Sequence, residues 1–562
     1  MKSSVSVGNV FVKHLVFAMS LLVLLSCGGG GGDNPSPPAG QNPPPASFVP
    51  PPPEKASLFL QRATFGTTIE QIEELQRIGY EAWIDQQMSL PATQHFPYYQ
   101  QFNVQEEDSW SQHVNAWWHR SITAPDQLRQ RVAFALSQIW VVSQHGVSSS
   151  GVKGVSSLSN YYDILLEHSF GNYRNLMQDV TLSPVMGEYL SMLKNEKPNV
   201  EKNIRPDENY AREFMQLFTI GLVELNNDGT QKLDSNANPI PTYNQSDIEG
   251  LAHVFTGWTW GNAPKFKWWD QNRDLNGPMR AFQEYHAEGE KRIVNNGLIP
   301  AGQTAEQDLT QALDHIFQHP NIGPFLSKQL IQKLVTSNPS NEYVARVTAV
   351  FNNNGRGIRG DIGAVVKAIL LDDEAINGVT HQGTLFGKVK EPILRLTTVW
   401  RAFDGKALNG QYDFRWVNGD FAQGPLQAHH VFNFYSPFYA PQGEIRGQGL
   451  VAPEMEIHTE GTIAKMTNHL HWRIISMNNL ERLSPDADDI IINLDRERLL
   501  AESSTIELVN HLDLLLMGNK MSEQMRAILI EYLDTFDADR ADKKAIEAVA
   551  MIVTSPEFAV QQ

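Results

Sequence analysis

The chain contains a single cysteine, Cys27, among its 562 residues. No disulfide can therefore link two parts of this chain, and the fold has to be stabilised by the burial of apolar side chains. Roughly 500 residues follow the cysteine, a length at which a chain buries most of its apolar surface without covalent cross-links. The composition, 41% hydrophobic and 19% charged, is typical of a globular protein.

The residues before Cys27 have the features of an export signal. Basic residues precede an apolar stretch from Leu15 to Leu25, which is too short to cross a bilayer of about 30 Å as a helix. Ser26 then precedes the cysteine, and this order resembles the lipobox of bacterial lipoproteins, in which the cysteine is acylated and becomes the first mature residue. We therefore expect residues 1–26 to be a lipoprotein signal peptide and Cys27 to be lipidated; a plain signal peptide with an incidental cysteine is the alternative.

The resemblance to lipoproteins also implies a location. In enterobacteria an aspartate directly after the lipidated cysteine retains the protein at the inner membrane, and here that position is Gly28. We expect an exported protein that is anchored by its lipid in the bacterial cell envelope, in the outer membrane rather than the inner one. The sequence leaves open whether the protein faces the periplasm or the cell surface.

A spacer follows the expected lipid anchor. Five glycines open this region, and the stretch from Pro35 to Pro53 is dominated by proline, which favours extended polyproline conformations. We expect residues 27–55 to be a disordered tether and residues 56–562 to form a single large domain, with two lobes as a variant of that arrangement. A proline-rich ligand for a recognition module is the alternative for the tether.

Charge and motifs exclude two classes of ligand. The net charge of −18, from 45 basic and 63 acidic residues, argues against nucleic acid, because phosphate neutralisation requires clustered lysine and arginine. Residues 355–360 satisfy the Gly-x-Gly-x-x-Gly pattern, but residues 347–351 before them read as the end of a helix rather than a strand. We therefore expect no dinucleotide and no other cofactor.

The folded part is predicted to be mainly α. Apolar residues recur with helical period in several segments, while extended segments are few. The clearest helical segments are Gln127 to Val142, Leu326 to Val335, Ile362 to Leu371, Met525 to Leu533 and Lys544 to Val553. The best extended segment is residues 221–243, where Asn227-Asp228-Gly229-Thr230 indicates the turn of a small β-hairpin. The sequence thus predicts a large multi-helix domain with a hairpin insertion.

Polar residues concentrate on one predicted helix, residues 207–220. Asp207 is placed to cap this helix and Gly221 to end it. Opposite its apolar stripe the helix carries two carboxylates, a guanidinium and amides, from Glu208, Asn209, Arg212, Glu213 and Gln216. The next predicted helix, over residues 246–258, begins with Ser246-Asp247-Ile248-Glu249, which has the form of a capping box.

These two helices carry a family resemblance. The matching residues are Glu208 to Glu213, Met215, Leu217 to Thr219, Gly221, Tyr243, Asp247, Ala252 and Thr256 to Trp258. Further matches are Leu60 to Gly66, His319-Pro320, Leu334-Val335, Pro392, Arg395, Val431 to Phe434 and Ser555 to Phe558. Together they resemble a bacterial family known only as a domain of unknown function, number 1800. The resemblance implies export, a helix-rich fold and a partner, since such genes often neighbour a gene for an exported protein of sulfatase-like fold.

Two interpretations apply to the polar helix. It is either a salt-bridge face or a polar site in which Glu208 or Glu213 acts as acid, base or metal ligand, oriented by Arg212 and Asn209. The neighbouring arginine should keep both carboxylates ionised, which suits a ligand or an ion-pair hub better than a proton donor.

His286 is a further candidate site residue. With Gly289 and Lys291 it falls where the family shows a His-Asp-x-Gly-x-Lys pattern, although Ala287 replaces the aspartate. No pair of histidines has metalloprotease spacing, and the family usually has arginine in place of His253, so the sequence leaves metal binding undecided.

Two functions remain open after these observations. The first is a binding or scaffolding module that works with the exported partner. The alternative is an envelope hydrolase, metal-assisted or not, in which Glu208, Glu213, Asp247 and His286 converge on one cleft. No catalytic residue is assigned. The aromatic residues of segment 258–269 are either core or, if exposed, a surface that stacks on sugar rings.

Overall fold

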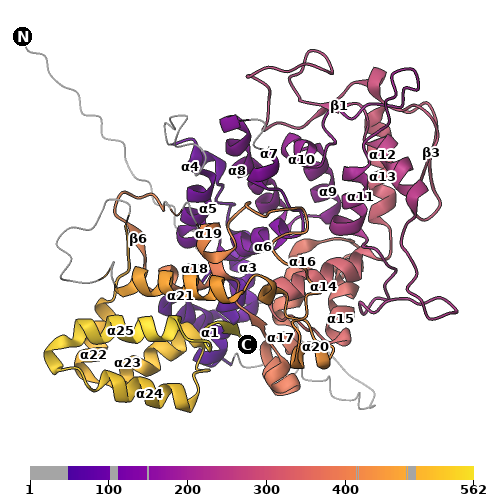
Figure 1. Ribbon diagram of the computed structural model, residues 1–562. Coiled ribbons are helices and arrows are strands. Elements are labelled where there is room, and N and C mark those ends of the chain that lie inside the picture. The colour runs from indigo at the N-terminus through magenta and orange to yellow at the C-terminus, as the bar shows by residue number, and fades with distance from the viewer. Residues whose placement is uncertain are drawn as a thin grey trace, which may run out of the picture. The chain divides into compact units, whose positions relative to one another are not determined.

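A computed structural model describes residues 49–101, 112–147, 151–412, 414, 417–475, 478 and 489–562 (Figure 1). Cys27, the expected signal peptide and most of the expected tether lie outside the described residues. The chain divides into two units, residues 1–49 and 50–562, and the description below concerns the second. Its first helix begins at Pro53, three residues before the predicted domain start, because proline is favoured in the first helical turn.

The second unit is mainly α, which confirms the predicted fold class. Its first helices are α1 (Pro53–Ala63), α2 (Ile69–Ile78), α3 (Tyr80–Ser89), α4 (Phe96–Tyr99), α5 (Gln112–Thr123), α6 (Gln127–Ser137), α7 (Gln144–Val147), α8 (Gly151–Glu167), α9 (Tyr173–Leu182), α10 (Pro184–Tyr189), α11 (Asn209–Glu213) and α12 (Gln245–Val254). They are followed by α13 (Ala305–Phe317), α14 (Ile322–Leu334), α15 (Asn341–Asn352), α16 (Ile362–Leu371), α17 (Asp373–Gln382), α18 (Pro392–Ala402), α19 (Val417–Phe421), α20 (Glu444–Gly447), α21 (Glu460–Ile475), α22 (Asp495–Ser503), α23 (Thr505–Leu512), α24 (Glu523–Leu533) and α25 (Ala541–Val553). Among the described helices, none has the length and apolar character needed to cross a bilayer.

Strands are short and occur in antiparallel pairs. They are β1 (Trp258–Thr259) with β2 (Arg280–Ala281), β3 (Lys291–Ile293) with β4 (Gly297–Ile299), β5 (Lys388–Val389) with β8 (Val560–Gln561), and β6 (Lys406–Ala407) with β7 (Ile490–Ile491). The β5–β8 pair joins the carboxyl end to the middle of the chain, with Lys388 opposite Gln561. The Arg62 guanidinium also donates a hydrogen bond of 2.7 Å to the backbone carbonyl of Gln562, so the carboxyl terminus is fixed beside α1 (Figure 1).

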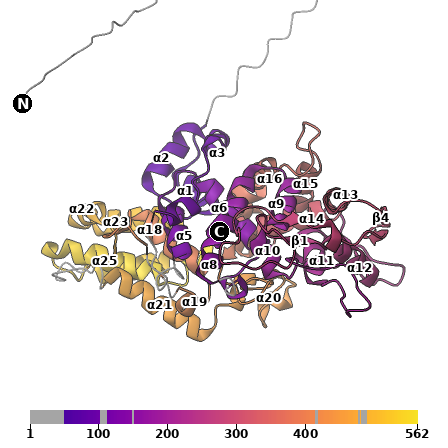
Figure 2. The same cartoon turned by 90° about the horizontal axis from the view of Figure 1, so that it is seen from above.

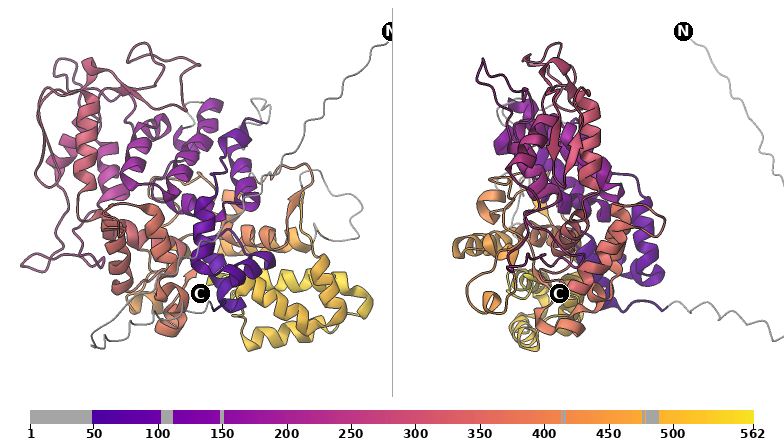
Figure 3. Two further views of the ribbon diagram at one scale, coloured as in Figure 1. Left: turned by 180° about the vertical axis from the view of Figure 1, so that it is seen from behind. Right: turned by 90° about the vertical axis from the view of Figure 1, so that its right-hand side faces the viewer.

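Two apolar cores hold the helices together. The first is formed mainly by α1, α6, α8, α9 and α12 to α16, and the second by α5, α18, α21 and α23 to α25. The views in Figures 2 and 3 show the last helices, α22 to α25, grouped at one end of the unit, away from α11 to α13. Most of the aromatic segment 258–269 is core: Trp258, Trp260 and Phe266 are buried, whereas Trp269 is 63% exposed.

The predicted hairpin is present, but isolated bridges rather than regular strands hold it. The N–H of Asn226 donates to Thr230 across the predicted turn, at 2.8 Å. Backbone hydrogen bonds then join three extended pieces. The N–H of Lys232 donates to the carbonyl of Glu224, and the N–H of Glu224 donates to the carbonyl of Ile240. The N–H of Ile240 donates in turn to the carbonyl of Lys232. We call residues 221–243 the hairpin segment.

The side chain of Asn321 fixes the hairpin segment against α14. Its Nδ2 donates to the carbonyls of Ile220 and Val223, at 2.9 and 2.7 Å, and its Oδ1 accepts from the N–H of Leu225 at 2.8 Å. Asn321 is fully buried directly before the first residue of α14. The hairpin segment is thus held beside one face of that helix.

Candidate functional site

Glu208 and Arg212 form an ion pair near the surface. The predicted helix of residues 207–220 is a short α-helix, α11, continued by a π-helix, η4 (Phe214–Thr219), and Gly221 ends it with φ of +72°. Arg212 Nη2 donates to Glu208 Oε2 at 3.1 Å, and Gln245 Nε2 of α12 donates to the same oxygen at 2.9 Å. Since both partners are partly exposed, the pair contributes little to stability. The neighbouring Asn209 is exposed, and its N–H donates to Asp207.

Glu213 lies apart from that ion pair. It is buried, and its Oε2 atom has no hydrogen-bond partner among the described residues. Burial raises the pKa of Glu213 above its ordinary value, and the nearby charge of Arg212 offsets this only in part. The net pKa shift of Glu213 is therefore opposite to the one that a neighbouring arginine alone would produce, because adjacent residues of a helix point in different directions and burial dominates.

Asp247 has a local structural role. Its carboxylate accepts from the N–H of Asn244 at 2.9 Å, while the Asn244 side chain accepts from the N–H of Ser246 and of Asp247. This is a capping box at the start of α12. The box is formed by Asn244 and Asp247 rather than by the predicted Ser246 and Glu249, so the helix begins two residues earlier than the sequence pattern indicated.

His286 and Lys291 come together on a residue that the sequence analysis missed, Asp308. Lys291 Nζ lies 2.5 Å and His286 Nε2 lies 2.9 Å from Asp308 Oδ2, and all three residues are buried. The other ring nitrogen, Nδ1, lies 2.9 Å from the carbonyl oxygen of Thr256. Asp308 stands in the first turn of α13, where an acidic residue also complements the helix dipole, and its sequence context therefore gave no separate signal.

The candidate residues thus belong to separate groups of contacts. Glu208 pairs with Arg212, Asp247 caps α12, and His286 binds Asp308, while Glu213 Oε2 has no partner in the described part of the chain. A hydrolase at this place would need these four side chains to meet in one cleft. Their contacts do not bring them together. In the described part of the chain, no group of three or more His, Cys, Asp or Glu residues is arranged to hold a metal ion.

A second set of charged residues meets in the interior, and we call it the charged network. Its members are Arg131, Lys333, Lys388, Glu391 and Glu454, all buried. Lys388 Nζ donates to Glu454 Oε1 at 2.9 Å and lies 3.8 Å from Glu391 Oε1. Arg131 Nη2 donates to the backbone carbonyl of Lys333 at 2.8 Å. Buried charges of this kind are costly unless paired, so the arrangement requires an explanation.

The pKa values of the two carboxylates of the network shift in opposite directions. Burial favours the neutral form of both, but for Glu391 the charges of Lys388, Arg131 and Lys333 outweigh burial and hold its pKa below the ordinary value. For Glu454 burial wins over Lys388, and its pKa is raised. The pKa of Lys333 falls to about 8, because burial outweighs the attraction of Glu391.

Gln138 joins the charged network to a cavity. Its Nε2 donates to Glu391 Oε2 at 3.0 Å, and its Oε1 accepts from Lys333 Nζ at 3.1 Å and from the hydroxyl of Tyr435 at 2.8 Å. Gln138, Lys333 and Tyr435 all line a cavity of about 560 Å³. We call it the hairpin cavity, because its other walls come from the hairpin segment, α14 and residues 431–438.

Apolar side chains make up much of the wall of the hairpin cavity. They include Ile139, Leu217, Leu225, Phe325, Val431 and Phe438. Two lysines, Lys328 and Lys333, also line it, and no aspartate or glutamate is among the described residues of its wall. An apolar wall with a few convergent polar groups is typical of a ligand site.

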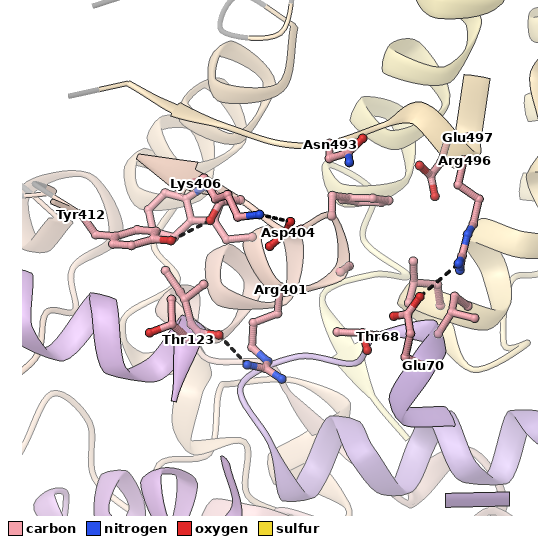
Figure 4. A pocket seen from close by; sticks show the side chains of 17 residues that line it. Thr68, Glu70, Thr123, Arg401, Asp404, Lys406, Tyr412, Asn493, Arg496 and Glu497 are labelled. Atoms are coloured by element: carbon pink, nitrogen blue, oxygen red, sulfur yellow. Dashed lines mark hydrogen bonds and ion pairs between the residues drawn. The ribbon is translucent and has the colours of Figure 1, made fainter. Parts of the chain in front are cut away.

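A second cavity, also of about 560 Å³, lies between α2, α18 and the start of α22 (Figure 4). The charged side chains that line it already have partners, and for Glu497 the partner is His511. Figure 4 shows Arg496 directed at Glu70, at 3.0 Å, and Lys406 directed at Asp404. The guanidinium of Arg401 donates to the carbonyls of Gly66 and Ile122. Since no lining charge awaits a partner, the hairpin cavity is the better candidate site.

The sequence predicted this site only in part. Residues 431–434 were noted for their family resemblance and Lys333 falls within a predicted helix, but neither pattern indicates a cavity. One local sign is Asn433, which has φ of +71°, a conformation that asparagine tolerates better than most residues.

Comparison with known proteins yields one match. A family model described as "Protein of unknown function (DUF1800)" matches residues 58–560. No curated protein and no solved structure matches the chain. The match covers both apolar cores, the charged network and the hairpin cavity.

Proposed function

The chain belongs to this family of proteins of unknown function, and from that premise we propose that it is a lipid-anchored binding module of the bacterial cell envelope, which holds an exported partner protein at the hairpin cavity. The helical unit supplies a rigid frame for that site. Cys27 supplies the anchor, and residues 27–55 supply the spacer that separates the frame from the membrane.

The observation that carries the proposal is the rim of the hairpin cavity. Three large apolar residues that line the cavity are exposed to solvent: Leu222 to 56%, Phe432 to 50% and Phe438 to 71%. Exposed aromatic side chains grouped beside a pocket are typical anchors of protein–protein interfaces, where burial of a few such residues supplies most of the binding energy.

The partner that we propose is the exported protein of sulfatase-like fold implied by the family resemblance. A partner held at the outer membrane needs no cofactor or catalytic residue on this chain. This fits the separate contacts of Glu208, Glu213, Asp247 and His286, none of which lines the hairpin cavity.

Affinity capture tests the proposal. An epitope is placed in the proline-rich stretch before Pro53, because the carboxyl terminus is fixed by Arg62 and by β5. The full chain is then isolated from membranes in detergent, and the neighbouring gene product is quantified by immunoblot. We expect Phe432→Ser and Phe438→Ser each to reduce its capture at least about tenfold, the loss of one interface anchor.

Trp269→Ser is the matched control, since Trp269 is an equally exposed aromatic residue outside the cavity wall. Its capture should equal that of the wild type. Undiminished capture by both phenylalanine variants, or absence of the neighbouring product from the wild-type sample, would overturn the proposed function.

A further inference from the structure

We infer that the hairpin cavity takes an apolar peptide segment that presents a carboxylate to Lys328 and Lys333. The inference rests on the proposed function and names the chemistry of the partner's contact. Three observations carry the inference. They are the charge balance of the buried residues, the lack of a carboxylate partner for Lys328 and Lys333 among the described residues, and the amide side chains that line the cavity.

The charged network is one carboxylate short. It contains three basic residues, Arg131, Lys333 and Lys388, but only two acidic ones, Glu391 and Glu454. Glu454 Oε1 pairs with Lys388 and Glu391 Oε2 accepts from two glutamine amides, and neither glutamate forms an ion pair with Lys333 among the described residues. A ligand carboxylate beside Lys333 would restore the balance at a buried position.

Lys333 and Lys328 are both available to such a group. Lys333 Nζ bonds to the amide oxygen of Gln138 and to no carboxylate among the described residues. Lys328 is half-buried and makes no hydrogen bond or ion pair within the described part of the chain; burial lowers its pKa, and the charge of Asp228 offsets this only in part. Two lysines on a wall without acidic residues, in a chain of net charge −18, select an anion.

The amide groups favour a peptide over a simple fatty acid. Five glutamines line the cavity: Gln138, Gln216, Gln231, Gln329 and Gln332. The buried Nε2 atom of Gln329 has no partner among the described residues, so a donor is left for a ligand carbonyl. Amides pair with a peptide backbone, which has both donors and acceptors, whereas an alkyl chain has neither.

Fluorescence anisotropy with the full chain in detergent tests the inference. The probe is a fluorescein-labelled pentapeptide of sequence Gly-Leu-Phe-Val-Leu, used with a free carboxyl terminus, as its carboxamide, and as a carboxamide in which glutamate replaces valine. We expect the free acid or the glutamate peptide to bind at least about tenfold more tightly than the neutral carboxamide, the effect of one charge-assisted hydrogen bond. Which of the two binds identifies the source of the carboxylate.

Lysine variants test which side chains cause the preference for the charged peptide. Lys333→Met and Lys328→Met should each reduce the preference for the charged peptide at least about tenfold, whereas Lys328→Arg should retain this preference. The control is Lys265→Met, at an exposed lysine outside the cavity, which should leave the preference unchanged. Thermal melting of each variant excludes misfolding as the cause.

Two results would overturn the inference: equal binding of acidic and neutral peptides, or displacement of the peptide by dodecanoate at concentrations below the peptide's own Kd. Either result leaves the proposed function intact if Phe432→Ser and Phe438→Ser still reduce partner capture at least about tenfold.

Discussion

Lys333 donates a hydrogen bond of 3.1 Å to the side-chain oxygen of Gln138, although two glutamates belong to the same buried network. At the wall of the hairpin cavity, the amine therefore has an uncharged hydrogen-bond partner. Burial lowers its pKa to about 8, well below that of an exposed lysine.

The first prediction concerns pH. Between pH 8 and 10.5 the unfolded chain binds a proton at Lys333 that the folded chain has released, so folding becomes more favourable as pH rises through this window. Lys333→Met removes this pH-dependent contribution to the free energy of unfolding. Urea unfolding at pH 7 and pH 10 should show the wild type gaining about 2 kcal/mol more than the variant on going to the higher pH. An identical pH dependence of the two proteins would contradict the shifted pKa.

A second prediction concerns the ion pair of Lys388 and Glu454, which is buried and 2.9 Å long. Lys388→Met leaves two glutamates without their nearest cation and should lower the free energy of unfolding by about 3 to 5 kcal/mol. Arg212→Met, which breaks the partly exposed pair with Glu208, should cost at most about 1 kcal/mol. Urea titration of both variants gives the comparison, and similar losses would show that burial does not distinguish the two pairs.

Glu213 supplies a third prediction, since its buried carboxylate has a raised pKa and one oxygen without a partner among the residues that the structure describes. Because the pKa of Glu213 is raised in the folded chain, its favourable contribution to the free energy of unfolding is fully present below the unfolded-state pKa of 4.5. That contribution is lost as pH rises through the folded-state pKa. Glu213→Gln should therefore increase the free energy of unfolding at pH 7 by roughly 1 kcal/mol and have little effect near pH 4. Glu208→Gln, at a partly exposed carboxylate, serves as the control for the substitution itself. Loss of stability in Glu213→Gln at pH 7 would mean that the charge is needed.

The fourth prediction concerns the anchor. If Cys27 is lipidated, radiolabelled palmitate should enter the wild-type chain and not the Cys27→Ser variant, and the variant should move from the membrane to the soluble fraction. Labelling of the serine variant to the wild-type level would remove the basis for the envelope location. Fractionation of both proteins by sedimentation and detergent extraction provides the measurement.

Several elements follow from local sequence alone. Residues 362–371 form the predicted helix α16 with the same bounds, because an uninterrupted apolar period and Asp361 as the N-cap specify it. The turn at residues 227–230 and the end of the polar helix at Gly221 were also predictable, since both depend on residues within a few positions of each other.

The candidate site did not follow in this way. Arg131, Lys333, Lys388 and Glu454 lie far apart along the chain, and each by itself reads as an ordinary surface charge. Asp308 likewise reads as a favourable residue in the first turn of a helix, although it binds His286 and Lys291. Only packing brings these residues together.

The sequence by itself determined the absence of an internal disulfide, the mainly α fold class and the family, because these depend on composition, short-range periodicity and local motifs. The tertiary structure alone decided which charges are buried, which of them lack a partner and where a cavity opens beside them. The physical reason is that desolvation and pairing depend on distances between segments remote in the chain, which no local pattern encodes.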